Sequence, residues 1–256
     1  MLALRIFWSD PFPLGRGATH AVLTSESRAR LCRAEEMNRT FRNRREAGRL
    51  LAERLAGHAG RPGLLVLALP RGGVPVGYEV AAALEAPLDV FVVRKVGVPG
   101  YEELAMGAVA SGGKHVVNDE VVAALGLTED QFAAAVAAET AEVERRERLY
   151  RDDRPPIDSH GRNVILVDDG LATGSTMRAA SLAVRAQEPE SLTVAVPVAA
   201  EQTCNELRAE VDEVVCAFTP EPFLAVGVWY DDFRPTSDDE VRELLAEAGQ
   251  LDRSVH

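Results

Sequence analysis

The fold of this chain is decided by the stretch Val164-Ile165-Leu166-Val167-Asp168-Asp169-Gly170-Leu171-Ala172-Thr173-Gly174-Ser175-Thr176-Met177. It begins with four apolar residues without polar alternation, which is typical of a central strand of a parallel sheet, covered on both faces. Two acids follow the strand directly, then a small, hydroxyl-rich loop, then residues with helical spacing. In such sheets ligands gather at the carboxyl ends of the strands. The stretch therefore predicts a ligand site at the end of a buried strand.

The residues after this strand have the chemistry of a pentose-phosphate site. Their loop offers backbone amides at a helix start, three hydroxyls, and a glycine that lets the backbone approach a phosphate closely. These features belong to Ala172, Thr173, Gly174, Ser175 and Thr176. The carboxylates of Asp168 and Asp169 can accept hydrogen bonds from vicinal ribose hydroxyls, directly or through water and a metal ion. The alternative is an acidic turn that only caps a helix, but here the acid pair, the loop and the strand coincide.

Short apolar runs alternate with helical segments along the rest of the chain. The predicted strands cover 64–69, 88–93, 164–167, 192–198 and 213–218, and the predicted helices cover 42–55, 76–84, 176–187 and 201–209. This alternation predicts an α/β fold with a doubly wound, mostly parallel sheet.

Two further strand ends carry basic residues. The strand 64–69 leads into Pro70-Arg71-Gly72-Gly73, and the strand 88–93 leads into Arg94 and Lys95. Alone, the first is more typical of a simple strand-to-helix turn, and the second is equally typical of a solvated basic pair. The loop after 164–167 favours a functional role for both, because the carboxyl ends of parallel strands meet at one edge of a sheet. We expect an anion pocket there.

Charge and composition exclude several classes of protein. The chain has 256 residues, 46% of them hydrophobic, which is enough for one substantial core. Its net charge of -12 argues against binding to nucleic acid or to anionic membranes. The nine arginines between residues 28 and 54 are interrupted by glutamates and indicate a solvated helix face.

The sequence also indicates the compartment. No run reaches the roughly 18 apolar residues of a membrane span, and residues 1–14 make a poor signal peptide. The three cysteines, Cys32, Cys204 and Cys216, have neither the spacing of a zinc site nor the density of a disulfide scaffold. We expect a protein of the reducing cytoplasm.

The chain divides into three parts. Residues 1–36 lack helical or strand periodicity and are predicted to be a poorly ordered extension. The main domain covers 37–237 and contains a helical insertion at 118–156, whose helix opens on the capping box Thr128-Glu129-Asp130-Gln131. Residues 238–256 are predicted to form a terminal amphipathic helix and a tail that loses order after about residue 248.

From about Arg42 to Phe233 the chain resembles type I phosphoribosyltransferases, above all bacterial ones of unassigned acceptor. The segment Asp168 to Met177 is especially similar to that of adenine phosphoribosyltransferases. The resemblance implies that 5-phosphoribosyl-1-pyrophosphate (PRPP) binds with Mg²⁺, which Asp168 and Asp169 hold through ribose hydroxyls or water. A homodimer is part of the expectation.

The resemblance also assigns roles to the basic strand ends. It makes Pro70 to Gly73 a pyrophosphate loop, with Arg71 as its basic side chain and a cis peptide between Pro70 and Arg71. Arg94 and Lys95 would face the pyrophosphate, and the segment from Gly97 to Gly113 would be a mobile lid.

The reaction implied by the resemblance transfers phosphoribose to a nitrogen acceptor and releases pyrophosphate. Asp168, Asp169, Arg71 and Lys95 would carry it. Ala172 stands where the enzymes for 6-oxopurines have an acid, which argues against hypoxanthine or guanine, and the lid lacks the glutamate of the adenine enzymes. The rival interpretation is a sensor that binds PRPP or a nucleotide without turnover.

The acceptor is expected to meet the aromatic segment from Pro222 to Phe233. Trp229 or Tyr230 would contact a planar, nucleobase-like acceptor, and Asp231 or Asp232 would orient it. The alternative is that these aromatic side chains only seal the core.

Overall fold

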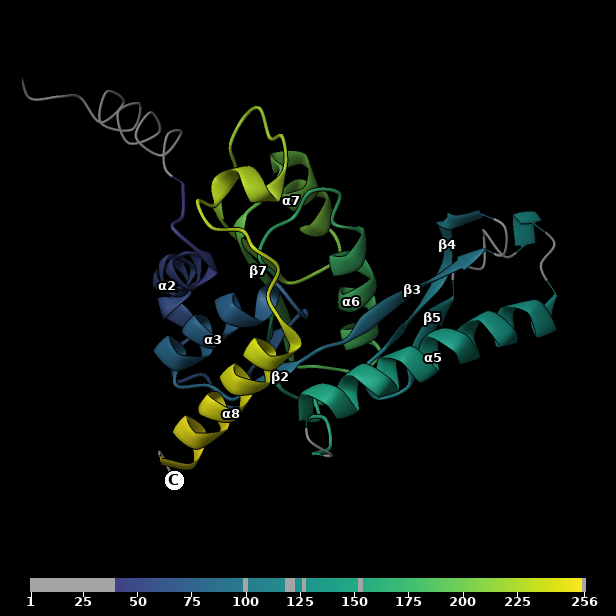
Figure 1. The fold of residues 1–256 in the computed structure, drawn as a ribbon, viewed down its shortest axis with the longest axis horizontal. Helices are drawn as coiled ribbons and strands as arrows, with labels where there is room; N and C mark the ends of the chain where they lie inside the picture. Colours follow the sequence, from purple (N-terminus) through teal and green to yellow (C-terminus); the bar gives the residue numbers. More distant parts are fainter. Residues whose placement is uncertain (1–39, 99–100, 118–122, 126–127, 152–153, 255–256) are drawn as a thin grey trace, which may run out of the picture. The chain divides into compact units, whose positions relative to one another are not determined.

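The computed structural model describes residues 40–98, 101–117, 123–125, 128–151 and 154–254 (Figure 1), so the predicted extension 1–36 lies outside the described residues. The α-helices are α2 (Arg44–Arg54), α3 (Gly73–Leu84), α5 (Glu129–Arg151), α6 (Ser175–Arg185), α7 (Glu201–Leu207) and α8 (Asp238–Ser254), and the short 3-10 helices are η1 (Ala56–His58) and η2 (Val226–Trp229). The strands are β1 (Leu64–Ala68), β2 (Leu88–Val90), β3 (Val93–Val98), β4 (Tyr101–Ala110), β5 (Lys114–Val117), β6 (Asn163–Val167), β7 (Ser191–Val198) and β8 (Glu213–Phe218).

The central sheet has five parallel strands in the order β2-β1-β6-β7-β8. The predicted α/β fold with a doubly wound parallel sheet is therefore confirmed. From β1 the chain proceeds to β2 on one side, and from β6 it proceeds to β7 and β8 on the other. The order thus reverses between β1 and β6, where Ala68 pairs with Val167. Crevices at such reversal points are the usual ligand sites of open α/β sheets.

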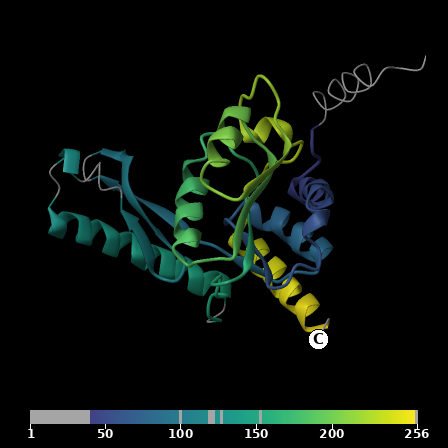
Figure 2. The same ribbon diagram turned by 180° about the vertical axis from the view of Figure 1, so that it is seen from behind.

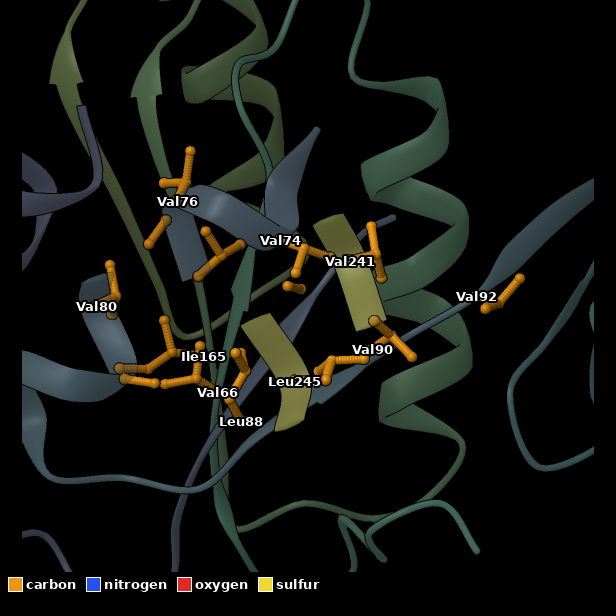
Figure 3. Close-up of a cluster of buried hydrophobic side chains, with 14 of the residues drawn as sticks. Val66, Val74, Val76, Val80, Leu88, Val90, Val92, Ile165, Val241 and Leu245 are labelled. Carbon is orange, nitrogen blue, oxygen red and sulfur yellow. The ribbon is translucent and has the colours of Figure 1, made fainter. Parts of the chain in front are cut away.

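Successive side chains of β1 and β6 point to opposite faces of the sheet and pack into the core on both sides. Val66 and Ile165 point to the face covered by α3 and α8, where they pack with Val74, Val241 and Leu245 (Figure 3). Their sequence neighbours on both strands point to the opposite face, against α6 and α7. Figure 2 shows these helices from behind. Because both faces are covered, both strands read as unbroken apolar runs.

The structure departs from the sequence prediction after β2. We expected one strand over 88–93, but β2 ends at Val90 and the chain leaves the sheet. It then enters a three-stranded antiparallel sheet of β3, β4 and β5. Where this sheet begins, the Ser111 amide donates to the Val92 carbonyl at 2.8 Å and the Val92 amide donates to Ser111 Oγ at 2.9 Å. Buried Val96, Val98 and Met106 attach this sheet to the core. The segment from Gly97 to Gly113, predicted as a lid, therefore consists largely of β3 and β4.

Helix α5 packs along β3 and β4 (Figure 1). The predicted capping box at its start is confirmed, because the Gln131 amide donates to Thr128 Oγ1 at 3.2 Å and the Thr128 amide to Gln131 Oε1 at 3.0 Å. At the other end, buried Arg151 donates to Asp89 of β2 at 2.8 Å. This pair fastens the insertion to the central sheet.

Two other expectations change. Helix α8 continues to Ser254 rather than ending near residue 248. Cys204 of α7 and Cys216 of β8 form a disulfide, although their spacing did not indicate a pair. The two residues meet because α7 folds back against β8, which spacing alone does not reveal. No helix of the described residues is long and apolar enough to cross a bilayer.

The disulfide leads to a prediction about stability. It closes a loop with a sequence separation of 12. Closing a loop of this size lowers the entropy of the unfolded chain and raises the free energy of unfolding by about 3 kcal/mol. We expect dithiothreitol, or Cys216→Ser, to lower Tm by roughly 5 to 10 °C. Peptide mapping without reduction should find Cys204 and Cys216 in one linked species. Separate alkylation of both cysteines in the unreduced protein would contradict the bond.

Candidate functional site

The hydroxyl-rich loop lies between the end of β6 and the start of α6. Gly174 adopts a positive φ of 68°, which an L side chain rarely allows. A Cβ there would come within 2.6 Å of Thr203 Cγ2, and the Thr203 hydroxyl donates to the Ala172 carbonyl at 2.7 Å. Helix α7 therefore holds the loop in place through Thr203. The side chains of Thr173, Ser175 and Thr176 remain exposed, together with Ala172, as an anion-binding loop requires.

The second loop touches the acid pair directly. A Cβ on Gly72 would lie 2.1 Å from Asp169 Oδ2, and a Cβ on Gly73 would lie 2.8 Å from the Val167 carbonyl oxygen. Only glycine fits at these two positions. The sequence prediction that the two loops share one edge of the sheet is confirmed by the β1–β6 pairing.

The peptide between Pro70 and Arg71 is cis, as predicted from the resemblance. The Arg71 side chain is about half exposed, and its Nη1 atom lies 3.9 Å from Asp238 Oδ1 at the start of α8. The Tyr150 hydroxyl donates to the same oxygen at 2.7 Å. Burial and this carboxylate raise the pKa of Tyr150 to about 12. Arg71 thus stands at the rim of the edge that carries the acid pair.

The acid pair is held by its surroundings at both residues. The Asp169 amide donates to Asp168 Oδ1 at 2.8 Å. Arg44 of α2 donates from Nε to Asp169 Oδ2, also at 2.8 Å, and both of these side chains are largely buried, with exposed fractions of 11% and 16%. The Tyr230 hydroxyl donates to the Asp169 carbonyl at 2.6 Å.

The electrostatics of the pair are those of two like charges that are largely removed from solvent. Burial raises the pKa of Asp168 well above its ordinary value, and the neighbouring charge of Asp169 raises it further. Burial also raises the pKa of Asp169, although the hydrogen bond and the charge of Arg44 oppose that shift. A cation or a set of hydroxyl donors placed against the pair would relieve this repulsion.

The other basic strand end lies elsewhere in the fold. Arg94 and Lys95 belong to β3 of the antiparallel sheet, not to the end of a central strand. Arg94 Nε pairs with Glu139 Oε2 of α5 at 2.8 Å, while Lys95 is exposed. The structure therefore does not bring these two residues to the acid pair by way of the central sheet.

The aromatic segment after β8 lies against α2. Tyr230 is buried, with its ring 5.2 Å from Phe41 and 5.0 Å from Phe233. Trp229 is half-buried, and Asp231 accepts from the Thr40 hydroxyl at 2.7 Å. Arg234 lowers the pKa of Asp232 to about 2. Exposed Leu224 and Val228 belong to the same segment. Of the predicted acceptor contacts, Tyr230 is the one that faces the acid pair.

Arg44 is the site residue that our sequence interpretation missed. We assigned the arginines between residues 28 and 54 to a solvated face, and that interpretation is wrong for Arg44. Helical spacing contained the signal, since Arg44 precedes buried Ala47, Gly48 and Leu51 by three, four and seven residues. Its partner is 125 residues away in sequence, so periodicity could place Arg44 on the inner face but could not name Asp169.

Comparisons with known proteins agree with this geometry. The family model described as "Phosphoribosyl transferase domain" matches residues 37–223. Proteins from two strains of Mycobacterium tuberculosis, both named "Putative phosphoribosyl transferase", are 44% identical over 222 residues, which is 84% of this chain and 50% of each relative. The crystal structure of TT1426 from Thermus thermophilus is 43% identical, with a TM-score of 0.74 over 81% of this chain and 98% of that one.

The buried acid pair predicts a stability that depends on pH. The folded state holds the proton of Asp168 more tightly than the unfolded state, so the stability of the wild type falls as pH rises from about 4 towards the raised pKa. Asp168→Asn removes this term. We expect the variant's Tm advantage over the wild type to grow with pH, measured calorimetrically in EDTA. Glu53→Gln, at an exposed position of α2, is the control. An advantage that stays constant from pH 4 to pH 9 would contradict the assignment.

Proposed function

The chain belongs to the phosphoribosyl transferase family, and on that premise we propose that it binds PRPP with Mg²⁺ and transfers the phosphoribose to a nitrogen acceptor, releasing pyrophosphate. One observation carries the proposal: the acid pair lies between a hydroxyl-rich loop and a glycine loop that leaves no room for a Cβ beside Asp169. Phosphate, ribose and pyrophosphate can follow one another along this edge in that order.

The proposal concerns the part of the relatives that this chain matches. The chain spans about half the length of the curated Mycobacterium tuberculosis proteins, so their remaining half has no counterpart in the match. Residues 37–223 include both loops and the acid pair.

Each group of residues has one role in the proposed reaction. The loop from Ala172 to Thr176 binds the 5-phosphate through backbone amides and hydroxyls. Asp168 and Asp169 accept hydrogen bonds from the ribose hydroxyls. Gly72 and Gly73 bring backbone amides to the pyrophosphate, and Arg71 supplies charge there. Arg94 and Lys95 join only if the β3–β4 segment closes over the substrate.

The bond between C1 of the ribose and the pyrophosphate oxygen breaks as a bond between C1 and the acceptor nitrogen forms. Both electrons of the broken bond leave with pyrophosphate, and the proton of the acceptor nitrogen passes to water. Positive charge builds on the sugar in the transition state, next to the carboxylates of Asp168 and Asp169. Preorganised negative charge at that position lowers the barrier.

The residues of the site fit Mg²⁺ carried by the substrate. Within the described part of the chain there is no group of three metal-ligating side chains, and Mg²⁺ commonly binds through one or two carboxylates plus substrate phosphates and water. Two buried carboxylates with raised pKa values suit such a cation. When bound, Mg²⁺ would neutralise charge on the departing pyrophosphate.

Binding without turnover is the second candidate function. The observation that favours it is Ala172, which is exposed in the phosphate loop and offers no acid to deprotonate an acceptor.

The primary proposal also includes a cytoplasmic location and a homodimer. The Cys204–Cys216 disulfide stands against that location, because such bonds are rare in reducing compartments.

The test of donor binding uses the acid pair. With Mg²⁺ present, the double variant Asp168→Asn, Asp169→Asn should lose PRPP affinity by at least about a hundredfold, since two charge-assisted contacts disappear, while its far-ultraviolet circular dichroism stays unchanged. Titration calorimetry measures the affinity. Acceptor-dependent release of pyrophosphate from labelled PRPP, screened with bases and metabolites, separates the enzyme from the sensor. Wild-type affinity of the double variant for PRPP would contradict the proposal.

The acceptor belongs, in this proposal, under the segment from Pro222 to Phe233. Trp229 or Tyr230 would contact a planar, nucleobase-like acceptor, and Asp231 would orient it. Once an acceptor is found, Trp229→Phe and Asp231→Asn should raise its KM several-fold and leave PRPP affinity within about twofold. Unchanged kinetics in both variants would place the acceptor elsewhere.

A further inference from the structure

One largely buried arginine connects helix α2 to the acid pair. Arg44 of α2 donates from Nε to Asp169 Oδ2 at 2.8 Å, and its side chain is 11% exposed. A buried guanidinium next to a buried carboxylate is expensive to place unless its remaining donors are also satisfied. The position of those donors therefore shows how firmly the pair is held.

The guanidinium of Arg44 is fixed on its other sides as well. Nη1 donates to the Arg234 carbonyl at 2.8 Å. The Cζ atom lies 4.0 Å from the centre of the Phe233 ring and 5.9 Å from that of Tyr230, which are cation–π distances. Arg44 of α2 is thus held against the segment after β8, which restrains its guanidinium beside Asp169.

Asp169 itself has little freedom. Its carbonyl accepts from the Tyr230 hydroxyl at 2.6 Å, and its carboxylate adjoins the Gly72 backbone so closely that an added Cβ would lie 2.1 Å from Oδ2. The same Cβ would lie 3.3 Å from Arg44 Nε. The Asp169 carboxylate therefore lies between the Arg44 guanidinium and the Gly72 backbone.

We propose that Arg44 is a positioning residue that fixes the Asp169 carboxylate in the orientation that meets the ribose hydroxyls. The inference rests on the proposed function. Arg44 acts through Asp169 and not on the substrate, because its side chain is only 11% exposed and two of its five donors are directed at Asp169 Oδ2 and the Arg234 carbonyl. Removing it should weaken contacts to the ribose and leave contacts to the pyrophosphate unaffected.

The next residue of α2 provides a matched control. Arg45 pairs with Glu79 of α3 and stacks at 4.8 Å over Tyr78. It has the same side chain, on the same helix, with the same two kinds of interaction, but it does not touch the acid pair. A change that follows only from losing a helix-anchoring arginine would appear in both positions.

The experiment compares three ligands on four proteins. Wild type, Arg44→Met, Arg44→Lys and Arg45→Met are titrated calorimetrically, with Mg²⁺, against PRPP, ribose 5-phosphate and pyrophosphate. Because a hydrogen bond to a charged group changes an equilibrium constant by about ten- to a hundredfold, Arg44→Met should lose at least tenfold for PRPP and ribose 5-phosphate. Its affinity for pyrophosphate should stay within twofold. Arg44→Lys, which keeps the charge, should recover part of the loss, and Arg45→Met should match the wild type.

A double-mutant cycle distinguishes the inference from the function on which it rests. If Arg44 acts through Asp169, then Arg44→Met combined with Asp169→Asn binds ribose 5-phosphate no more weakly than Asp169→Asn alone. Additive losses, equal losses for pyrophosphate, or wild-type binding by Arg44→Met while Asp169→Asn is impaired would each overturn the role of Arg44. Wild-type binding by Asp169→Asn would instead overturn the proposed function.

Discussion

The parallel pairing of β1 with β6 is the constraint on which the rest of the structure depends. These strands come from opposite sides of the α5 insertion, and their pairing from Leu64 with Asn163 to Ala68 with Val167 ends both strands at one edge. The strand order reverses between them. The two loops that follow are therefore neighbours in space, separated by little more than the backbone of Gly72 and Gly73.

That neighbourhood creates an electrostatic problem as well as a site. Asp168 and Asp169 lie at the edge of a covered sheet, where burial raises the pKa values of both and the charge of Asp169 raises that of Asp168 further. Above the ordinary pKa of an aspartate, ionising these two carboxylates is unfavourable in the folded state and lowers its stability, as is common where a site is prepared for a ligand. The structure limits this effect with the guanidinium of Arg44, which donates to Asp169 Oδ2, and with the Asp169 amide, which donates to Asp168 Oδ1.

Local pattern predicted the central elements well because it is the pattern that tertiary packing requires. The unbroken apolar run of β6 is buried on both faces, and β8 begins and ends where alternation and flanking residues indicated. The prediction was wrong where a strand changes sheets: β2 and β3 are separated only by Phe91 and Val92. Apolar residues continue across that point, so hydrophobicity could not mark it.

The sequence by itself determined the fold class and placed the acid pair and the hydroxyl-rich loop at the end of a buried strand, because these follow from residues adjacent in the chain. Only the tertiary structure decided that Arg44 faces Asp169, that Tyr230 supports the same residue, and that Arg94 lies on the antiparallel sheet beside Glu139. Each of these contacts joins residues 45 or more positions apart. Such contacts depend on how the covered sheet brings distant helices and segments together, and no local periodicity carries that information.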